Sequence, residues 1–254
     1  MFADTLKPFV AARRLLSPPV SALRSLAAVA LLAGSSAAAQ VQGPSAEAVT
    51  EEPVREFALT LIDTGTKEVF YRSGGTEYFL LPPGRARTRE RYRYQGASPI
   101  VFYDKVTNAE GEVVERPIAR AAFPDSYRQM LILIQPRDDR WTQTRTIVLD
   151  DALSAFPADS ARVLNISLYP LACAINGKQF ALERGDDRII RLGHHKGVID
   201  WKIAARMEGE WKLVRSSAAQ FLPGMRELII VNVAVADGGQ PKLDIFAVSD
   251  RPRQ

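Results

Sequence analysis

From residue 55 onward, the sequence consists almost entirely of short apolar runs separated by glycine, proline, asparagine or aspartate. Runs such as residues 57–62 and 228–235 are rich in β-branched and aromatic side chains, which favour strands. Sustained helical periodicity is absent from this region. In residues 150–160, Pro157 limits any helix to one turn. The pattern therefore predicts an all-β chain.

Two parts of this region are similar when residue n is aligned with residue n + 98. Residues 110–134 align with residues 208–232 without a gap, and seven of the 25 positions are identical. Both segments open with Glu-Gly-Glu, which predicts a hairpin turn with glycine at positive φ. A unit of about 95 residues with seven or eight short strands is typical of a β-sandwich, with a single large barrel as the alternative.

We therefore predict an all-β protein with two tandem, internally duplicated, immunoglobulin-like β-sandwich domains after a signal peptide. The expected boundaries are a signal peptide at 1–39, a flexible lead-in at 40–54, a first β-sandwich at 55–153, a linker at 154–160, a second β-sandwich at 161–250 and a tail at 251–254.

The alignment also selects candidate structural residues. Identical or similar pairs should occupy equivalent core positions because aromatic side chains dominate such cores. An arginine stands just before the most apolar strand of each unit, and we expect its head group to satisfy backbone or loop carboxylates at the sheet edge. These pairs are Phe123 with Phe221, Tyr103 with Trp201, and Arg128 with Arg226.

Residues 1–39 have the features of a secretory signal peptide. Arginines precede a short apolar run at residues 26–33, and Ala37 and Ala39 fit the small-residue rule for cleavage, which is expected after Ala39. The apolar run is too short to cross a bilayer. We therefore expect a bacterial protein of the periplasm or extracellular space, with no transmembrane segment in the mature chain.

Removal of the signal changes the charge of the protein. Residues 1–39 contain four of the 33 basic and one of the 29 acidic residues. The mature chain then carries 29 basic and 28 acidic residues, a net charge of +1. Overall charge gives no long-range attraction to nucleic acid, so no nucleic-acid partner is expected.

The residues that carry chemistry form no recognisable catalytic or metal motif. His194 and His195 are adjacent, and as strand neighbours they would point to opposite faces. The single cysteine, Cys173, occupies an alternating position in an apolar strand and is expected to be buried. Glycine patterns of nucleophile elbows and nucleotide-binding loops are absent. We therefore predict no enzyme, no cofactor and no metal, with an unrecognised hydrolase as a remaining alternative.

Five arginines alternate strictly within residues 84–96, GRARTRERYRYQG. On a single strand they would share one face over about 26 Å. Such a face could bind a polyanion, because the guanidinium group can form two hydrogen bonds to one carboxylate or phosphate. Alternatively, the face is solvated with weak ion pairs, or it docks against the other domain. The second unit has no such row. These residues, here called the arginine row, are Arg85, Arg87, Arg89, Arg91 and Arg93.

Three local patterns resemble duplicated β-sandwich proteins of the bacterial envelope, such as the accessory proteins of alginate acetylation. They are the ARVLNIS strand at residues 161–167, the Asn176-Gly177 turn and a strand that ends in F-x-L-x-x-G. The resemblance covers residues 55–250 in pattern only, and no functional residue is carried over. It implies two β-sandwich domains that bind or support the modification of a polysaccharide. An uncharacterised exported family is the alternative.

These observations together predict a non-catalytic exported envelope protein that binds or scaffolds. The expected ligand is an anionic polysaccharide or another polyanion held by the arginine row. The alternative is a structural or assembly subunit of an envelope protein complex, which would use exposed strand edges.

Overall fold

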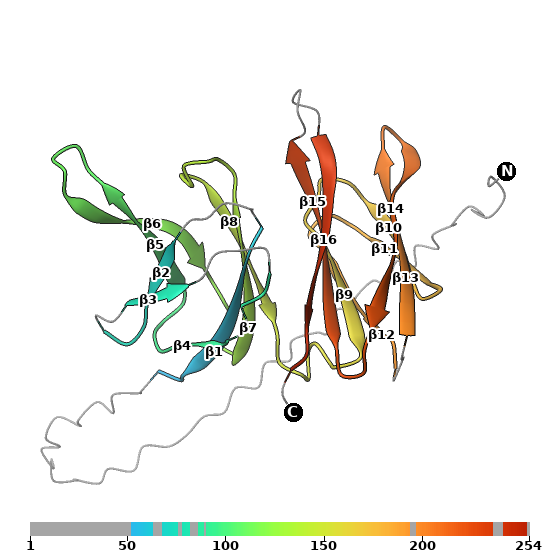
Figure 1. Cartoon of the computed structure of the whole chain (residues 1–254), viewed down its shortest axis with the longest axis horizontal. Coiled ribbons are helices and arrows are strands. Elements are labelled where there is room, and N and C mark those ends of the chain that lie inside the picture. The colour runs from blue at the N-terminus through green and yellow to red at the C-terminus, as the bar shows by residue number, and fades with distance from the viewer. Residues whose placement is uncertain are drawn as a thin grey trace, which may run out of the picture. The chain divides into compact units, whose positions relative to one another are not determined.

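The fold is known from a computed structural model, which describes residues 52–62, 68–75, 78–81, 86–88, 90–193, 197–235 and 241–252. The predicted signal peptide and nearly all of the lead-in lie outside these residues. Residues Thr50–Gln254 belong to one compact unit. Every regular element among the described residues is a β-strand, which confirms the all-β prediction (Figure 1).

The described residues form sixteen strands. The first eight are β1 (Arg55–Leu61), β2 (Val69–Arg72), β3 (Tyr78–Leu81), β4 (Tyr92–Tyr94), β5 (Ile100–Thr107), β6 (Val113–Ala121), β7 (Gln129–Pro136) and β8 (Thr144–Asp150). The second eight are β9 (Ser160–Asn165), β10 (Leu171–Ile175), β11 (Lys178–Leu182), β12 (Asp187–Arg191), β13 (Gly197–Met207), β14 (Glu210–Phe221), β15 (Arg226–Val235) and β16 (Pro241–Asp250).

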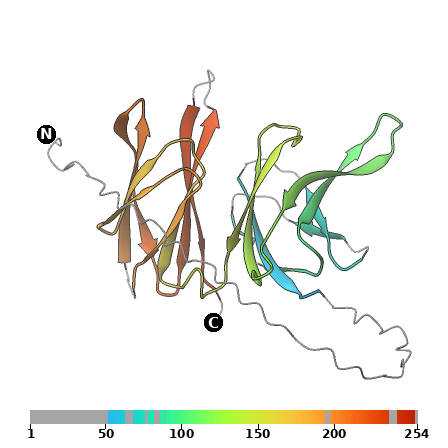
Figure 2. The same cartoon turned by 180° about the vertical axis from the view of Figure 1, so that it is seen from behind.

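The strands form four sheets of four strands each (Figures 1 and 2). The first half contains sheets β4-β1-β7-β8 and β3-β2-β5-β6. The second half contains sheets β12-β9-β15-β16 and β11-β10-β13-β14. In each half one pair is parallel, β1 with β7 and β9 with β15. The order of the strands is therefore the same in the two halves when β1 is matched with β9.

Aromatic side chains fill the core of the first half. Phe57 on β1 contacts Tyr71 on β2 edge to face, with the ring centroids 5.0 Å apart, and also lies against Phe102 on β5. Met130 and Ile132 of β7 face the same core and are fully buried. Because these residues come from both sheets of the half, the two sheets form a sandwich.

The second half has a more aliphatic core. Val163 on β9 and Ile229 on β15 pack with Cys173 on β10 and with Trp201 and Ile203 on β13. Cys173 is a free cysteine with 3% of its surface exposed, which confirms that it is buried. Burial raises the pKa of its thiol to about 12, so the reactive thiolate is not populated at neutral pH.

A third apolar core joins the two sandwiches. Leu131 and Leu133 use the face of β7 opposite to Met130, and they pack with Leu228 and Ile230 of β15. Both faces of β7 and β15 are therefore buried, which explains why these two strands are apolar at nearly every position. The side chains of Gln135 and Asn232 add a hydrogen bond of 2.9 Å between the halves.

The predicted linker is part of this joint. Phe156 is only 2% exposed and belongs to the core between the sandwiches. The backbone N–H groups of Ala155 and Phe156 both donate to the carbonyl of Ala152, which forms a single tight turn. Ser160 is already the first residue of β9. Residues 154–160 thus connect the halves through packed structure.

The n + 98 alignment holds at some positions and fails at others. Phe123 and Phe221 are both buried, at 6% and 0% exposure. Gly111 and Gly209 have φ values of +85° and +88°, as the Glu-Gly-Glu turns require. Tyr103 was predicted to match Trp201, but it is only half-buried.

The mismatch arises because the two strands bury positions of different parity. The buried positions of β5 are even-numbered, such as Phe102, whereas those of β13 are odd-numbered, such as Trp201. An offset that is wrong by one residue places a side chain on the opposite face of a sheet. Phe102, at 0% exposure, therefore takes the inward position, while Trp201 is 5% exposed in its own sandwich.

Candidate functional site

The described members of the arginine row do not lie on one strand, so the prediction of a single strand face was wrong. Of Arg87, Arg91 and Arg93, only Arg93 belongs to a strand, the short β4. Along β1, Arg55 faces Tyr94 and Phe57 faces Tyr92, so a regular ladder would place Glu90 opposite Leu59. Instead, the backbone of Leu59 bonds to Thr88. The segment therefore contains two more residues than the ladder can take.

Thr88 explains how the irregular segment is held. Its backbone N–H donates to the carbonyl of Leu59, and its hydroxyl accepts from the N–H of Leu59 at 3.0 Å. One residue thus satisfies both backbone groups of Leu59. Glu90 and Arg91 lie outside any strand, and the side chains of Arg87 and Arg91 turn toward an acidic residue. Arg85 and Arg89 lie outside the described residues.

Arg87 and Arg91 both bind Asp151, which follows β8. The Arg87 guanidinium donates to both carboxylate oxygens of Asp151, one of them at 3.0 Å, and Arg91 donates to the second oxygen. The side chain of Asp151 is 1% exposed, that of Arg87 8% and that of Arg91 25%. These two members of the row are therefore internal ion-pair partners.

The second half of the chain adds a third arginine to the same carboxylate. Arg226, fully buried at the start of β15, lies 3.3 Å from an Asp151 oxygen. It also binds Asp250 of β16 through two bonds of 3.0 and 2.6 Å. Asp250 in turn lies 3.1 Å from Arg87. We call Arg87, Arg91, Asp151, Arg226 and Asp250 the arginine–aspartate cluster.

Arg226 is fully satisfied by its surroundings. One terminal nitrogen donates to the backbone carbonyls of Asp151 and Phe156, each at 3.0 Å. The guanidinium carbon lies 4.9 Å from the centre of the Phe156 ring. A buried arginine is tolerated only when its charge and its donors are paired, as they are here. The cluster therefore holds the two sandwiches together through buried ion pairs and hydrogen bonds.

The electrostatics of Asp151 follow from this geometry. Burial opposes ionisation of the carboxyl group. The hydrogen bond from Arg87 and the positive charges of Arg87, Arg226 and Arg91 outweigh it, so the pKa of Asp151 lies below its ordinary value. An acid held ionised between three cations is a poor proton donor, which favours a structural role.

Arg93 and Arg128 occupy surface positions. Arg93 is exposed on β4, opposite Glu56 of β1. Arg128 is also exposed, and it donates to the carbonyl of Asp125 at 3.4 Å. The buried arginine of the first sandwich is Arg55, at 4% exposure and 4.8 Å from the Phe123 ring. The matched pair Arg128 and Arg226 thus has one exposed and one buried member.

Sequence reasoning missed Asp151, Asp250 and Arg55. Asp151 is one of two adjacent acids after a strand, a pattern that is common in turns. The sequence signal for it was indirect: a row of like charges is costly unless acidic residues neutralise it. The neighbouring sequence did not indicate which acidic residue would neutralise the arginines.

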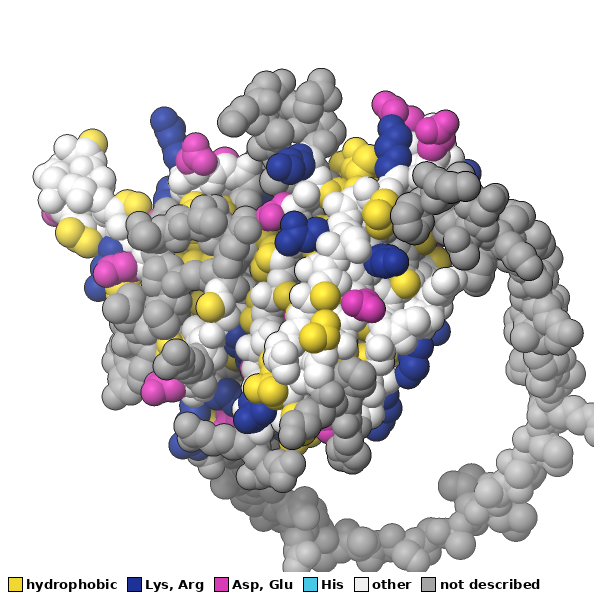
Figure 3. All heavy atoms as spheres, turned by 45° about the vertical axis from the view of Figure 1, so that its right-hand side comes forward, with side chains coloured by type: hydrophobic (Ala, Val, Ile, Leu, Met, Phe, Trp, Pro, Cys, Tyr) yellow, Lys and Arg dark blue, Asp and Glu magenta, His cyan; other side chains and the backbone are white. Residues whose placement is uncertain are grey.

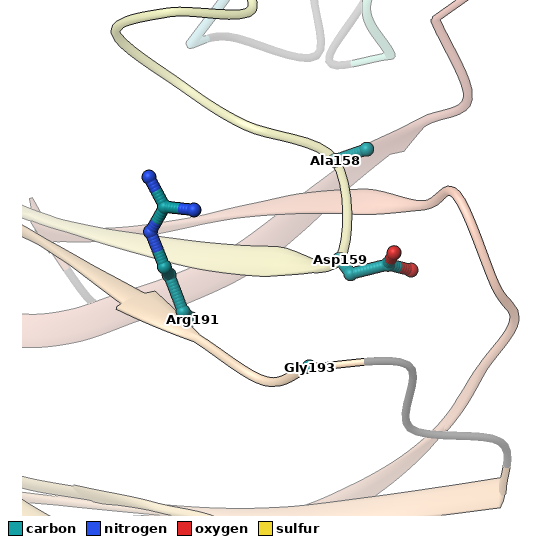
Figure 4. A pocket seen from close by; sticks show the side chains of 4 residues that line it. All are labelled: Ala158, Asp159, Arg191 and Gly193. Atoms are coloured by element: carbon teal, nitrogen blue, oxygen red, sulfur yellow. The ribbon is translucent and has the colours of Figure 1, made fainter.

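A small hollow lies beside the start of β9. It measures about 220 Å³ and is lined by Ala158, Asp159, Arg191 and Gly193 (Figure 4). Figure 4 shows the Arg191 and Asp159 side chains pointing in different directions. The Asp159 carboxylate accepts a bond of 2.6 Å from the N–H of Gly224 and so holds two loops together. The hollow does not bring an acid and a base together.

Strands β13 and β14 expose three large apolar side chains, with Trp211 and Leu213 near one end of the pair and Val198 near the other. Val198 on β13 is 56% exposed, and Trp211 and Leu213 on β14 are 46% and 65% exposed. Figure 3 shows exposed hydrophobic side chains among lysines and arginines on the face turned to the viewer. β14 forms the end of its sheet, and β13 is its only strand neighbour among the described residues. This edge is the strongest candidate for a binding surface.

Within the described residues, no group of three histidine, cysteine, aspartate or glutamate side chains is placed to hold a metal ion. His194 and His195 lie outside those residues. The described part of the chain contains no helix with the length and apolar character needed to cross a membrane.

Comparison with known proteins adds no relative. No family model matches the chain, and no curated protein matches it significantly. The resemblance to alginate acetylation accessory proteins therefore stays a prediction.

Proposed function

We propose that this protein is an exported, non-catalytic assembly protein of the bacterial envelope that binds a partner protein through a strand edge. The observation that carries the proposal is β14, a strand of 12 residues at the end of its sheet with exposed Trp211 and Leu213. Unpaired edges of this length pair readily with another chain, and monomeric proteins usually shorten, cover or charge them.

The proposed role needs no catalytic residue. The most deeply buried ionic groups, Asp151 and Arg226, are paired with each other and join the sandwiches. Arg87 belongs to the same cluster and is ion-paired with Asp151, so its guanidinium group is not available to bind a polyanion. Binding of an acidic polysaccharide along the arginine row is therefore not proposed.

We further propose that the two halves are copies of one sandwich unit. The matching strand orders of the two halves and the gapless alignment of residues 110–134 with 208–232 support this. In this chain the corresponding edges, β6 and β14, differ in how they are covered.

The proposal includes export by the signal at residues 1–39. We expect mature protein to begin at Gln40. Mass spectrometry of protein recovered from the periplasm or medium checks this, and a mature chain that keeps residues 26–33 would contradict it.

Purification from the producing bacterium tests the proposed function. Affinity-tagged protein, cross-linked in intact cells, should recover one envelope protein in near-stoichiometric amount. The same material should be probed for acidic polysaccharide with a wash of rising salt. Recovery of polysaccharide without a protein, or of neither, would contradict the proposal.

A further inference from the structure

Edge strand β14 differs from its counterpart β6 in the first sandwich. The hydroxyl groups of Thr144 and Thr146, on β8, donate to the β6 carbonyls of Ile118 and Arg120, each at 2.6 Å. Pro117 lies within β6 and cannot donate a backbone hydrogen bond. The β6 edge is thus covered by its neighbour and interrupted by proline.

The second sandwich lacks both features. β14 contains no proline. Its neighbour by fold position, β16, corresponds to β8 and has only one hydroxyl side chain, Ser249, which lies near its end. Among the described residues, β14 makes no hydrogen-bonded pairing on the side away from β13. Its backbone donors and acceptors on that side face outward.

The pairing register of β14 shows which of its side chains lie on the inner face of the sheet and which lie on the outer face. The pairing with β13 shifts between Ile203 and Ala204, so that Arg215 lies opposite Ile203 and Leu213 lies opposite Ala204. Ile203 belongs to the buried core, whereas Ala204 is on the outer face. Leu213 and Trp211 therefore share the outer face, and Arg215 lies at the rim of the inner face.

The charge nearest the middle of this edge, Arg215, favours an acidic side chain opposite it, whereas Glu210, on the same side of β14, lies at the start of the strand. Arg215 is exposed and forms no ion pair with a described residue. Lys212, on the same side as Arg215, is held by Glu208 at 3.1 Å. A strand added to β14 places a side chain directly opposite Arg215, where an opposite charge is stabilising and a like charge is not.

We propose that β14 is the docking edge for an extended segment of a partner protein in which apolar and acidic residues alternate. The segment adds a fifth strand to the sheet β11-β10-β13-β14. Its apolar side chains pack on Trp211 and Leu213, and an acidic side chain pairs with Arg215. This inference rests on the proposed function and names the chemistry of the partner at that same surface.

Two short synthetic peptides test the inference with the mature protein. One alternates valine with glutamate, and the other alternates valine with lysine. In an NMR titration, the glutamate peptide should shift and protect the amides of β14 and β13. We expect it to bind about tenfold more tightly than the lysine peptide, because one attractive cross-strand pair replaces a repulsive one.

Charge reversal provides the sharper test. Arg215→Glu, at an exposed position, should invert the preference for the two peptides. Arg93→Glu is the matched control, since Arg93 is an exposed arginine on another edge strand, β4. It should leave the preference unchanged. Absence of binding, binding away from β14, equal affinity for both peptides, or an equal effect of the control would overturn the inference.

The envelope purification separates this inference from the proposed function. If wild-type protein recovers a partner and Arg215→Glu recovers it equally well, the docking edge is wrong and the proposed function stands. If wild-type protein recovers no partner, the proposed function itself fails, whatever the peptides show.

Discussion

At the scale of single residues, arginines of the same row differ in exposure and in ion pairing. Arg87 and Arg93 belong to one alternating row, yet the first is 8% exposed in its side chain and ion-paired, whereas the second is exposed on β4. Asp151 makes the difference because it neutralises the arginines that reach it. The role of a charged residue here depends on which opposite charge lies within reach.

Replacement of Asp151 by asparagine should lower the free energy of unfolding by about 3–5 kcal/mol, because three arginines lose their shared counter-charge in a buried site. The lowered pKa of Asp151 means that its contribution is present above the unfolded value of about 4 and is lost as pH falls through the lower folded value. Urea denaturation between pH 2 and 7 measures both effects. The exposed Asp139→Asn serves as control, and an equally small change in both variants would contradict the role of Asp151.

Glu227 should affect the pH dependence of stability in the opposite direction to Asp151. It is 4% exposed on β15, and burial raises the pKa of its carboxyl group above the ordinary value of 4.5. Folding then favours the protonated form, so stability from this group is greatest below pH 4.5 and falls as pH rises through the folded pKa. Glu227→Gln should therefore raise the free energy of unfolding at pH 7 and change it little at pH 4. A variant less stable at pH 7 would contradict this.

At the scale of strands, the two sandwiches differ in how their edge strands β6 and β14 are covered. β6 is hydrogen-bonded to β8 through two threonine hydroxyl groups, whereas β14 is hydrogen-bonded only to β13 among the described strands. Both are long strands at sheet ends. The difference therefore comes from a few side chains that cover one edge.

Thr144→Val and Thr146→Val should each lower the free energy of unfolding by about 0.5–1.5 kcal/mol, since each removes a hydrogen bond to a β6 carbonyl without much change in shape. Hydrogen exchange should become faster along β6. Thr107→Val, at an exposed position on β5, is the control. Unchanged exchange in the double variant would show that these hydroxyl groups do not protect the edge.

At the scale of the whole molecule, the two sandwiches share a core. Leu131, Phe156 and Ile230 come from the first half, the connecting segment and the second half, and all belong to one apolar cluster. The arginine–aspartate cluster adds polar contacts at the same joint. Shared burial of this kind couples the stability of the two halves.

We expect the wild-type protein to unfold in a single calorimetric transition. Phe156→Ala should lower the free energy of unfolding by about 3–5 kcal/mol and split the transition in two, because the ring fills the shared core and supports Arg226. Phe70→Ala, at a half-buried position on β2, should cost less and keep one transition. Two transitions in the wild type would contradict the coupling.

Much of the fold followed from local sequence patterns. The β-branched and aromatic runs predicted the all-β class, and the apolar runs at residues 130–134 and 228–231 identified the most apolar strand of each half. Cys173 was correctly placed inside by its alternating position. These features are determined locally, because a strand alternates its side chains between two faces whatever its partners are.

The candidate site depended on contacts that local patterns do not contain. The partner of Arg87 lies 64 residues further along the chain, and that of Arg226 lies 75 residues back. Whether an edge is open depends likewise on Thr144 and Thr146, 26 residues from the carbonyls they cover. Alternation could place the arginines on a strand face only if the ladder continued, and Thr88 ends it by bonding to Leu59. The sequence by itself thus determined the strands and their apolar faces, and only the tertiary structure decided which charges meet and which edge stays open, because both depend on distant residues brought together by folding.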